Sequence, residues 1–350
     1  MAGGEGRRRY ACIVHRESIV IVTPALADAN NGNWQTARRW ARMLQSAYRV
    51  RLAAQWVEGD DAMMIALHAR RSAPSMAAWR AAHPQRPLLL ALTGTDLYRD
   101  IDTDASAQHS LAVADTLVVL NELGAQRLPA AVRGKCQVLL QSCPSRRTLP
   151  KTPLHLRALM VGHLRDEKDP ITYFRAARCL ADRTDILLDH VGAPLDPALG
   201  AEAAALAQAQ ANYRWLGALP HAATRQRIQA AHLLVHPSRM EGGAHVVIEA
   251  IRGGTPVLAS HIAGNLGLLG NDYTGTFAAG DDAALVALLQ RARDDPDMLP
   301  DLQRQLAQRA ALFSPEAERT TLHSLVSELM ARHQSESHPG RTDERTTDSR

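Results

Sequence analysis

The chain contains 350 residues, with 40 lysine plus arginine against 36 aspartate plus glutamate, which gives a formal net charge of +4. A hydrophobic content of 46% and a charged content of 22% are ordinary for a globular protein, and so small a net charge argues against an obligate nucleic-acid partner. The length is sufficient for two domains that each bury a core. Three of the 40 basic residues are lysines, namely Lys135, Lys151 and Lys168.

The sequence carries no sign of a membrane or secreted protein. It has no run of about 18 apolar residues, so no membrane span is expected. Residues 1–17 carry three consecutive arginines but no secretory apolar stretch, and they are interpreted as an N-terminal extension. The four cysteines lack C-x-x-C spacing and are typical of a reducing compartment, so a cytoplasmic location is expected.

The first part of the chain alternates apolar runs with helix-like segments. Residues 18–23 (SIVIVT) form a continuous apolar run, as in a strand buried on both faces of a parallel sheet. Apolar residues then recur at helical spacing, including Ala37, Trp40 and Leu44. Further strands are predicted at 50–55, 62–67, 88–93, 116–120 and 137–140. This alternation predicts a doubly wound parallel sheet.

A proline-rich segment, residues 143–153, interrupts the alternation and is typical of a linker. The pattern then restarts, with strands predicted at 156–161, 186–191, 213–216, 233–236 and 256–259. Helical periodicity resumes at 281–293, 298–313 and 315–332. The remaining residues, 333–350, are polar and are predicted to be disordered.

We therefore predict an α/β protein with two Rossmann-like domains whose parallel sheets face each other across a cleft. After the 1–17 extension, the predicted units are a first domain at 18–147, a linker at 148–155, a second domain at 156–314, a crossing helix at 315–332 and a tail at 333–350. Ligands of open α/β sheets bind at the carboxyl ends of the strands, so the loops at that edge are the candidate sites.

The first candidate loop is residues 28–33 (DANNGN), which precede the first predicted helix. Gly32 permits close backbone approach, and Asn33 is a good helix N-cap. Together with Asn31, these residues form a helix start that can bind an anion. The loop is not G-x-G-x-x-G, so the fingerprint of a nicotinamide-dependent dehydrogenase is missing.

The second candidate is residues 161–170 (VGHLRDEKDP), between a predicted strand and helix. Arg165 and Lys168 can offset the charge of a diphosphate there. The alternative is a solvated turn, in which Asp166, Glu167 and Asp169 pair with these two cations.

The third candidate is residues 236–250 (HPSRMEGGAHVVIEA), which leave a predicted strand and enter a helix. Gly242 and Gly243 free the backbone at the helix start, where diphosphate oxygens can accept N–H bonds. Glu241 and Glu249 are eight residues apart, and the second lies about 9 Å further along the helix. This separation suits one carboxylate at the sugar and one at the ribose of a nucleotide sugar, without a metal.

Residues 237–277 resemble the signature of the family 4 glycosyltransferases. They carry Glu241-x7-Glu249, the sequence GGTPV at 253–257 and a glycine-rich segment up to Gly275. The resemblance covers residues 18–330 and implies the GT-B fold, with an acceptor domain, a nucleotide-sugar donor domain and a final helix that crosses back to the first domain.

The resemblance also implies roles for individual residues. Glu241 meets the donor hexose, Glu249 the nucleotide ribose and Lys168 the diphosphate. The family usually has arginine where His163 stands, and Arg165 is the candidate to supply that charge. The implied catalytic residues are Glu241, Lys168 and Arg165, and the implied donor-binding residues are Glu249, Gly242, Gly243, His163 and Ala244.

A narrower resemblance is to the selenosugar synthases of selenoneine biosynthesis. It rests on residues 31–37 (NGNWQTA), 162–165 (GHLR) and 264–270 (GNLGLLG). Such enzymes join selenophosphate to a UDP-sugar, with UDP-N-acetylglucosamine a favoured donor, and give a 1-selenosugar, UDP and phosphate. The partners implied are therefore a nucleotide sugar and a small anionic acceptor, and no metal or other cofactor is expected.

Acceptor-binding residues are predicted at Asn31, Gly32, Asn33, Thr95 and Asp96. Thr95 and Asp96 follow a first-domain strand, and the alternative role of Asp96 is to cap the next helix. Asp102-Thr103-Asp104 has the D-x-D form of a metal motif but does not follow a buried strand, so no metal site is predicted.

Three other functions are weighed against selenosugar synthesis. Transfer of a sugar to a hydroxyl or thiol acceptor uses the same fold. A nicotinamide-dependent dehydrogenase also has Rossmann units, but the glycine fingerprint is absent. A sugar-nucleotide sensor would bind the donor without turnover.

Overall fold

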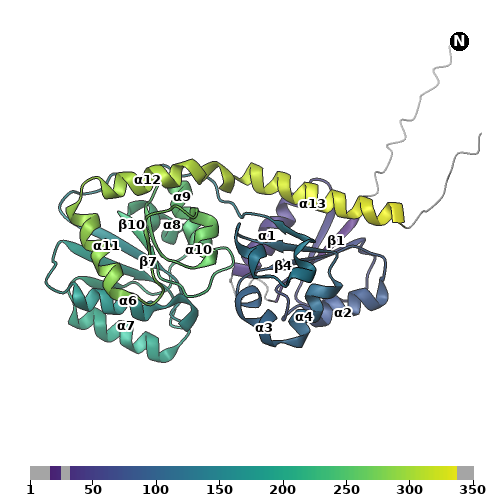
Figure 1. Cartoon of the computed structure of the whole chain (residues 1–350), viewed down its shortest axis with the longest axis horizontal. Coiled ribbons are helices and arrows are strands. Elements are labelled where there is room, and N and C mark those ends of the chain that lie inside the picture. Colours follow the sequence, from purple (N-terminus) through teal and green to yellow (C-terminus); the bar gives the residue numbers. More distant parts are fainter. Residues whose placement is uncertain (1–15, 25–31, 337–350) are drawn as a thin grey trace, which may run out of the picture.

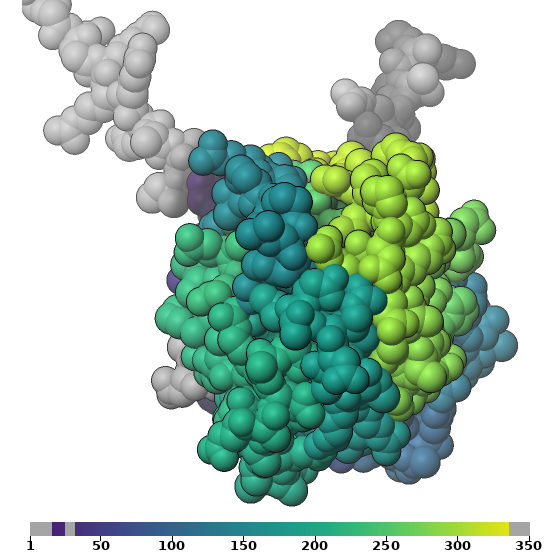
Figure 2. Space-filling view, turned by 90° about the vertical axis from the view of Figure 1, so that its left-hand side faces the viewer, coloured from purple at the N-terminus to yellow at the C-terminus, as the bar shows by residue number. Residues whose placement is uncertain are grey.

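The computed structural model describes residues 16–24 and 32–336, and it confirms the predicted α/β fold of two Rossmann-like domains. Figure 1 shows two lobes side by side, with helix α12 (Met298–Arg309) along the second lobe and α13 (Pro315–Glu336) continuing over the first. Figure 2 views the molecule from the side of the second lobe, whose teal and green segments fill most of the foreground.

The first sheet has six parallel strands in the order β2-β1-β3-β4-β5-β6. The strands are β1 Ser18–Val22, β2 Arg49–Ala53, β3 Met63–Leu67, β4 Leu88–Leu92, β5 Thr116–Val119 and β6 Cys136–Val138. The helices and turns around them are α1 Gly32–Leu44, α2 Ala73–Ala82, η2 Asp96–Asp100, α3 Ile101–Thr103, α4 Ala105–Val113, η3 Gly124–Arg127 and α5 Ala130–Arg133.

The second sheet also has six parallel strands, in the order β12-β11-β10-β7-β8-β9. The strands are β7 Leu156–Val161, β8 Ile186–Val191, β9 Tyr213–Trp215, β10 Leu233–His236, β11 Val257–Ser260 and β12 Thr276–Phe277. The helices and turns are η4 Asp166–Lys168, α6 Pro170–Cys179, α7 Pro197–Ala209, α8 His221–Ala230, α9 His245–Gly253, α10 Ala263–Leu269, α11 Asp282–Asp294, α12 and η5 Ala310–Phe313.

The central strands are buried on both faces, as their continuous apolar sequences predict. In β1, Ile19 and Ile21 belong to one hydrophobic core, whereas Val20 and Val22 belong to the core on the opposite face of the sheet. Successive side chains of a strand point to opposite faces, so each layer of helices packs against its own set of strand residues.

The crossing helix connects the end of the second domain to the first. Leu322, Val326 and Leu329 of α13 are buried with Trp40 and Leu44 of α1 in the same core. This packing confirms the predicted return of the last helix to the first domain. No helix in the described residues is long and apolar enough to cross a membrane.

The last helix extends four residues further than predicted, to Glu336, so predicted disorder from His333 is wrong for residues 333–336. His333 Nδ1 lies 2.9 Å from the Gln85 carbonyl oxygen, and Gln334 Nε2 donates to Glu17 Oε1 at 2.9 Å. These contacts with the first domain extend the helix beyond the end of its apolar periodicity. Residues 337–350 lie outside the described part.

The start of α1 also differs from the prediction. The helix begins at Gly32, so Asn33 lies within its first turn and not at its N-cap. Asn31 lies outside the described residues. The two-residue strand β12 was not predicted because Thr276–Phe277 is too short to show a period.

Candidate functional site

The carboxyl ends of the two sheets face each other, and their loops touch. A Cβ atom added to Gly242, after β10, would lie 2.5 Å from the carbonyl carbon of Thr93, after β4. Asn121, after β5, is fully buried and donates from Nδ2 to the Gly242 carbonyl at 2.7 Å. The position of Gly242 therefore requires glycine, because the backbones of the two domains approach each other there.

Glu241 lies in this contact region and is 9% exposed. Lys168 Nζ donates a hydrogen bond to Glu241 Oε1, and His236 Nε2 lies 3.1 Å from the same oxygen. Burial alone would raise the pKa of Glu241, but the charge of Lys168 and the contact with His236 hold it well below its usual range. Glu241 is thus an ionised carboxylate with its cationic partner in place.

Lys168 reaches Glu241 from the loop between β7 and α6. Its aliphatic stem packs beside Gly162, where an added Cβ would lie 3.5 Å from the lysine Cγ and Cδ. Asp169 has a left-handed backbone with φ 46° and caps α6 by accepting from Thr172 N and Oγ1. This cap ends the loop sharply and directs Lys168 toward the other loop.

Glu249 is buried on α9 and is held by three basic side chains. His221 Nε2 lies 2.7 Å from Glu249 Oε1, Arg225 Nε 3.4 Å and His245 Nδ1 3.5 Å from it. Burial would raise the pKa of Glu249, but the hydrogen bonds and charges of the two histidines lower it to about 2. Glu249 is ionised at neutral pH.

The two glutamates share an arrangement that the sequence does not reveal. Within the described part of the chain, every hydrogen bond and ion pair of Glu241 or Glu249 goes to Oε1. Each carboxylate therefore has a second oxygen, Oε2, that can accept from a hydroxyl group.

The start of α9 lies between the two glutamates. Among the described residues, none accepts a hydrogen bond from the backbone N–H of Gly243 or Ala244. Ala244 is the N-cap residue, and its side chain makes no cap. The free N–H groups and the positive end of the helix dipole make this the point best suited to a phosphate group.

His221, His245 and Glu249 also form the one group of potential metal ligands found in the described residues, with ligand atoms within 4.8 Å of one another. Sequence reasoning missed it because His221 comes from another helix; the i, i+4 pair His245 and Glu249 was the available signal. Arg225 already places a cation on the same carboxylate oxygen, so the charge of Glu249 is balanced without a metal.

His163 and Arg165 differ in their surroundings. His163 Nδ1 accepts a hydrogen bond from Ala193 N at 3.0 Å, so the neutral ring carries its proton on Nε2. Burial, together with Arg165 and Lys168, lowers the pKa of His163. Arg165 is exposed, and its ion pair is with Glu167 at 3.8 Å, not with Glu241. Among the described residues, Arg165 therefore has no ion pair with Glu241 or Glu249, and its catalytic role stays a prediction.

The predicted acceptor residues of α1 lie near the donor loops through one bridging side chain. Gly32 is exposed and Asn33 half-buried at the helix start. Thr36 Oγ1 donates to the Gly32 carbonyl, and buried Gln141 donates from Nε2 to Thr36 Oγ1 at 2.6 Å. Gln141 Oε1 also lies 3.3 Å from the Cβ position at Gly243. Gln141 thus stands between the starts of α1 and α9.

The structure changes the expected role of Asp96. Its carboxylate is fully buried and accepts hydrogen bonds from the backbone N–H groups of Ala69, Thr93 and Gly94, at 2.8–2.9 Å. These bonds satisfy the carboxylate, so Asp96 holds the loop after β4 and does not reach an acceptor directly. Two of these donors, Thr93 and Gly94, belong to the same loop, and Ala69 belongs to the loop after β3. Thr95 Oγ1, half-buried, lies 3.1 Å from His68 Nε2.

The D-x-D segment and the buried Cys143 lie outside the candidate site's chemistry. Asp104 of the D-x-D segment caps α4 by accepting from Ser106 N and Ala107 N, and Asp102 pairs with Arg127. Burial raises the pKa of the Cys143 thiol to about 11, with a further contribution from Glu249, so it is an unreactive thiol.

Two residues near the site have features that the sequence does not show. His68 has a positive φ of 75°, and Asn121 spans the two domains. Neither lies in a recognisable motif. A left-handed backbone at a non-glycine residue cannot be read from periodicity, and Asn121 acquires its role only through tertiary packing.

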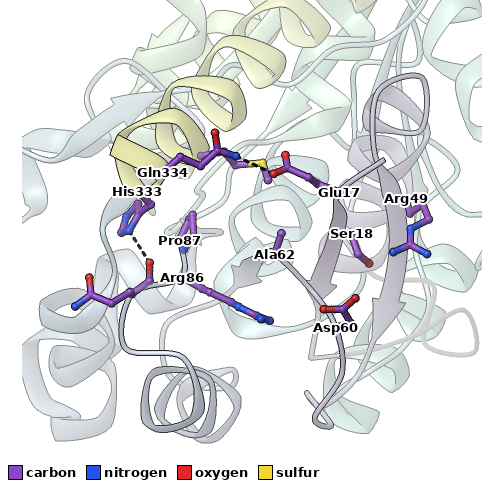
Figure 3. Close-up of a pocket in the computed structure, with 11 residues that line it drawn as sticks. Glu17, Ser18, Arg49, Asp60, Ala62, Arg86, Pro87, His333 and Gln334 are labelled. Atoms are coloured by element: carbon purple, nitrogen blue, oxygen red, sulfur yellow. Dashed lines mark hydrogen bonds between the residues drawn. The ribbon is translucent and has the colours of Figure 1, made fainter. Parts of the chain in front are cut away.

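A cavity of about 520 Å³ lies elsewhere in the first domain, at the amino ends of β1, β3 and β4 beside the end of α13 (Figure 3). Ser18, Ala62 and Pro87 line it, together with Arg86 and His333. This edge of the sheet is opposite the one that carries Thr93 and Asn121, so the cavity is not part of the candidate site.

Comparisons with known proteins match the second domain to one family. The model of the family described as "Glycosyl transferases group 1" matches residues 146–312. The D-inositol 3-phosphate glycosyltransferase of Streptomyces coelicolor is 37% identical over 86 residues, which are 24% of this chain and 19% of that protein. The match thus spans about a fifth of that relative's length.

Solved structures resemble most of the chain. Sucrose-phosphate synthase from Thermosynechococcus elongatus has a TM-score of 0.72 at 18% identity, covering 91% of this chain and 100% of that one. The HepE protein of Anabaena, in complex with UDP and glucose, has a TM-score of 0.69 at 14% identity, covering 89% and 100%. At such identities the likeness shows the fold, which is GT-B.

Proposed function

Because residues 146–312 match the model of the glycosyl transferases group 1 family, we propose that this chain transfers a sugar from a nucleotide-diphosphate donor to a small anionic acceptor. The observation that carries the proposal is the pair of ionised glutamates on either side of a helix start whose first N–H groups, at Gly243 and Ala244, have no acceptor among the described residues. This arrangement offers one carboxylate for the hexose, one for the ribose and a positive helix end for the diphosphate between them.

The leaving diphosphate meets several positive or donating groups. Lys168 already neutralises Glu241 and can share its ammonium with a phosphate oxygen. The start of α9 supplies backbone N–H groups, and His163 supplies an Nε2–H donor. Fixed donors that meet charge as it develops on the leaving group usually make the greatest single contribution to catalysis of this kind.

The proposed donor is a UDP-sugar, with UDP-N-acetylglucosamine first. This choice follows the resemblance in sequence, and the structurally similar HepE protein was solved with UDP and glucose. The proposal includes no metal or other cofactor, because Lys168 and the helix start provide the positive charge that the diphosphate requires.

The proposed acceptor is selenophosphate, as in the selenosugar synthases of selenoneine biosynthesis. A second helix start, that of α1, lies beside Gln141, which also approaches Gly243 at the start of α9. Two helix starts close to one side chain suit two anions, the donor diphosphate and an anionic acceptor. A selenium nucleophile that is ionised near neutral pH needs no strong base, consistent with the engagement of Asp96 by backbone amides.

The proposed reaction has two steps, each of which forms one bond and breaks another. Selenium attacks C1 of the sugar, the C1–Se bond forms, and the C1–O bond to the diphosphate breaks with its electron pair leaving on UDP. Water then cleaves the P–Se bond, which releases phosphate and the 1-selenosugar. Closure of the two domains excludes water from the first step.

Transfer to a phosphate-bearing hydroxyl acceptor is the second candidate. It is favoured by the partial match to a D-inositol 3-phosphate glycosyltransferase, whose named acceptor also carries a phosphate group. Both candidates predict an anion at the start of α1, and they differ in the attacking atom.

The test is incubation of the purified chain with UDP-N-acetylglucosamine and enzymatically generated selenophosphate, followed by mass spectrometry and UDP quantification. We expect a selenium-containing sugar and an equivalent amount of UDP. Release of UDP with inositol phosphate, an alcohol or a thiol, but not with selenophosphate, would reject the acceptor and keep the glycosyltransferase. Donor binding without UDP release for any acceptor would indicate a sensor.

A further inference from the structure

We propose that His245 is a positioning residue that couples donor binding at Glu249 to the contacts that hold the two domains together. The inference rests on the proposed function, since it needs a nucleotide sugar at Glu249.

A buried carboxylate lies at the junction of the domains. Glu318 of α13 is 1% exposed and accepts from Arg39 Nε at 2.9 Å, Trp40 Nε1 at 2.8 Å and Ser142 N at 2.9 Å, as well as from the Ser142 hydroxyl. We call Arg39, Trp40, Ser142 and Glu318 the Glu318 cluster. It joins α1, the crossing helix and the segment that leads from the first domain to the second.

Burial of Glu318 restricts the positions that its hydrogen-bond partners can take. A buried carboxylate is stable only when charged or polar donors surround it, so displacement of α1 or of the connecting segment would expose or orphan Glu318. The cluster therefore favours one relative position of α1, Ser142 and α13.

His245, the first residue of α9 in the second domain, contacts this cluster. Its Nε2 lies 3.2 Å from the Ser142 carbonyl oxygen and 3.4 Å from Arg39 Nη1. Its Nδ1 lies 3.5 Å from Glu249 Oε1. One imidazole thus touches the predicted ribose carboxylate with one nitrogen and the Glu318 cluster with the other.

The two nitrogens are linked by the protonation of the ring. A neutral imidazole carries one proton, so when Nε2 donates to the Ser142 carbonyl, Nδ1 presents a lone pair to the Glu249 carboxylate. When Nδ1 donates to Glu249, a neutral Nε2 is free to accept from Arg39 instead. A change in the hydrogen bonds that Glu249 accepts therefore changes whether Nε2 of His245 donates to the Ser142 carbonyl or accepts from Arg39.

Donor binding makes such a change. The two vicinal hydroxyls of a ribose can donate to both oxygens of Glu249, and the one that reaches Oε1 competes there with His245 and with His221, whose side chain is 60% exposed. The contact of His221 with Glu249 stays within the second domain, whereas His245 reaches Arg39 of the first domain. His245 is the member of the pair that can transmit donor binding across the domain boundary.

Two substitutions separate the contacts of the ring. In H245N the amide takes the place of Nδ1, which keeps a contact with Glu249 and removes the one with the cluster. In H245Q the amide reaches the place of Nε2, which keeps the cluster and weakens the contact with Glu249. H109A, at an exposed histidine of α4, is the matched control.

The measurements are UDP affinity by calorimetry, compaction on addition of UDP by small-angle X-ray scattering, and kcat. We expect UDP to compact the wild type and H109A. H245N should bind UDP as the wild type does but lose compaction, with kcat lower by about tenfold, whereas H245Q should bind UDP more weakly and keep compaction. If H245N does not fold, R39K cuts the same link from the first domain and should give the H245N result.

The outcomes distinguish the two proposals. If the wild type binds no UDP, the proposed function and this inference both fall. If the wild type binds UDP but does not compact, or if H245N and H245Q behave alike, the inference is overturned and the proposed function stands.

Discussion

The two glutamates of the site lie on one loop and helix of the same domain, yet their surroundings differ. Glu241 pairs with Lys168 and buried His236, all within the second domain. Glu249 pairs with His221, Arg225 and His245, and His245 continues to the first domain. One carboxylate is thus fixed within its own domain, and the other is connected by hydrogen bonds to the junction between domains. If Glu241 meets the sugar and Glu249 meets the ribose, as proposed, this contrast gives the two ends of the donor separate tasks, which are orientation and closure of the domains.

The greatest loss should come from Lys168, because it neutralises Glu241 and faces the proposed diphosphate. In K168A we expect kcat/KM to fall by about 10²- to 10³-fold, the range found for loss of one fixed charge-stabilising group. K135A, a lysine of the first domain outside the site, is the matched control. Equal losses in both variants, or full turnover in K168A, would contradict the assignment.

The next effect concerns contact between the domains. G242A adds a Cβ 2.5 Å from the Thr93 carbonyl carbon, so the domains cannot approach as closely. We expect turnover to fall by about 10²-fold while UDP affinity remains near that of the wild type, because only the relative position of the reactants is disturbed. G134A, with no atom within 4 Å of the added Cβ, should behave as the wild type. Normal turnover in G242A would show that this approach is not needed for the reaction.

The third prediction separates the two glutamates directly. E249A removes a charged acceptor for the ribose, so UDP should bind about 10- to 100-fold more weakly. E241A should leave UDP binding nearly unchanged and weaken turnover of the UDP-sugar, since its carboxylate is proposed to meet the hexose. Calorimetry with UDP and with UDP-N-acetylglucosamine measures both. Unchanged UDP affinity in E249A would remove its ribose assignment.

The fourth prediction is a pH dependence of stability. Because the pKa of Glu249 falls from 4.5 to about 2 on folding, its contribution is complete above about pH 4.5 and is lost as the pH falls toward 2. The lost contribution is roughly 3 kcal/mol at most. Urea unfolding of the wild type and E249Q between pH 5 and 2.5 should therefore converge on the acid side. Parallel curves across this range would contradict the shift.

Metal removal should have the least effect of all. Since Lys168 and the start of α9 supply the positive charge in the proposal, dialysis against EDTA should leave turnover unchanged. Loss of activity that returns with a divalent cation would assign the group of His221, His245 and Glu249, or the substrate diphosphate, a metal-dependent role.

Most of the fold could be predicted because buried parallel strands are continuous apolar runs. Strands β7, β8 and β10 match the prediction to the residue. Helix α13 was predicted too short because its last residues are stabilised by contacts with Gln85 and Glu17, not by apolar periodicity.

Site residues could be predicted only where they lie together in one sequence motif. Their spacing singles out Glu241 and Glu249, and both are buried, ionised carboxylates in the structure, while their roles toward a donor stay predictions. The contacts of Glu249 with His221, and of Asn121 with Gly242, depend on packing between distant segments. Asp96 was assigned to the acceptor because a carboxylate after a strand is a common site residue, and the backbone amides that occupy it leave no pattern in the sequence.

Turnover of the proposed substrates tests the central claim. The purified chain with UDP-N-acetylglucosamine and selenophosphate should release UDP and form a sugar that contains selenium, and K168A should do so at a greatly reduced rate. No release of UDP with selenophosphate, inositol phosphate, a thiol or an alcohol would contradict the claim that this chain is a glycosyltransferase.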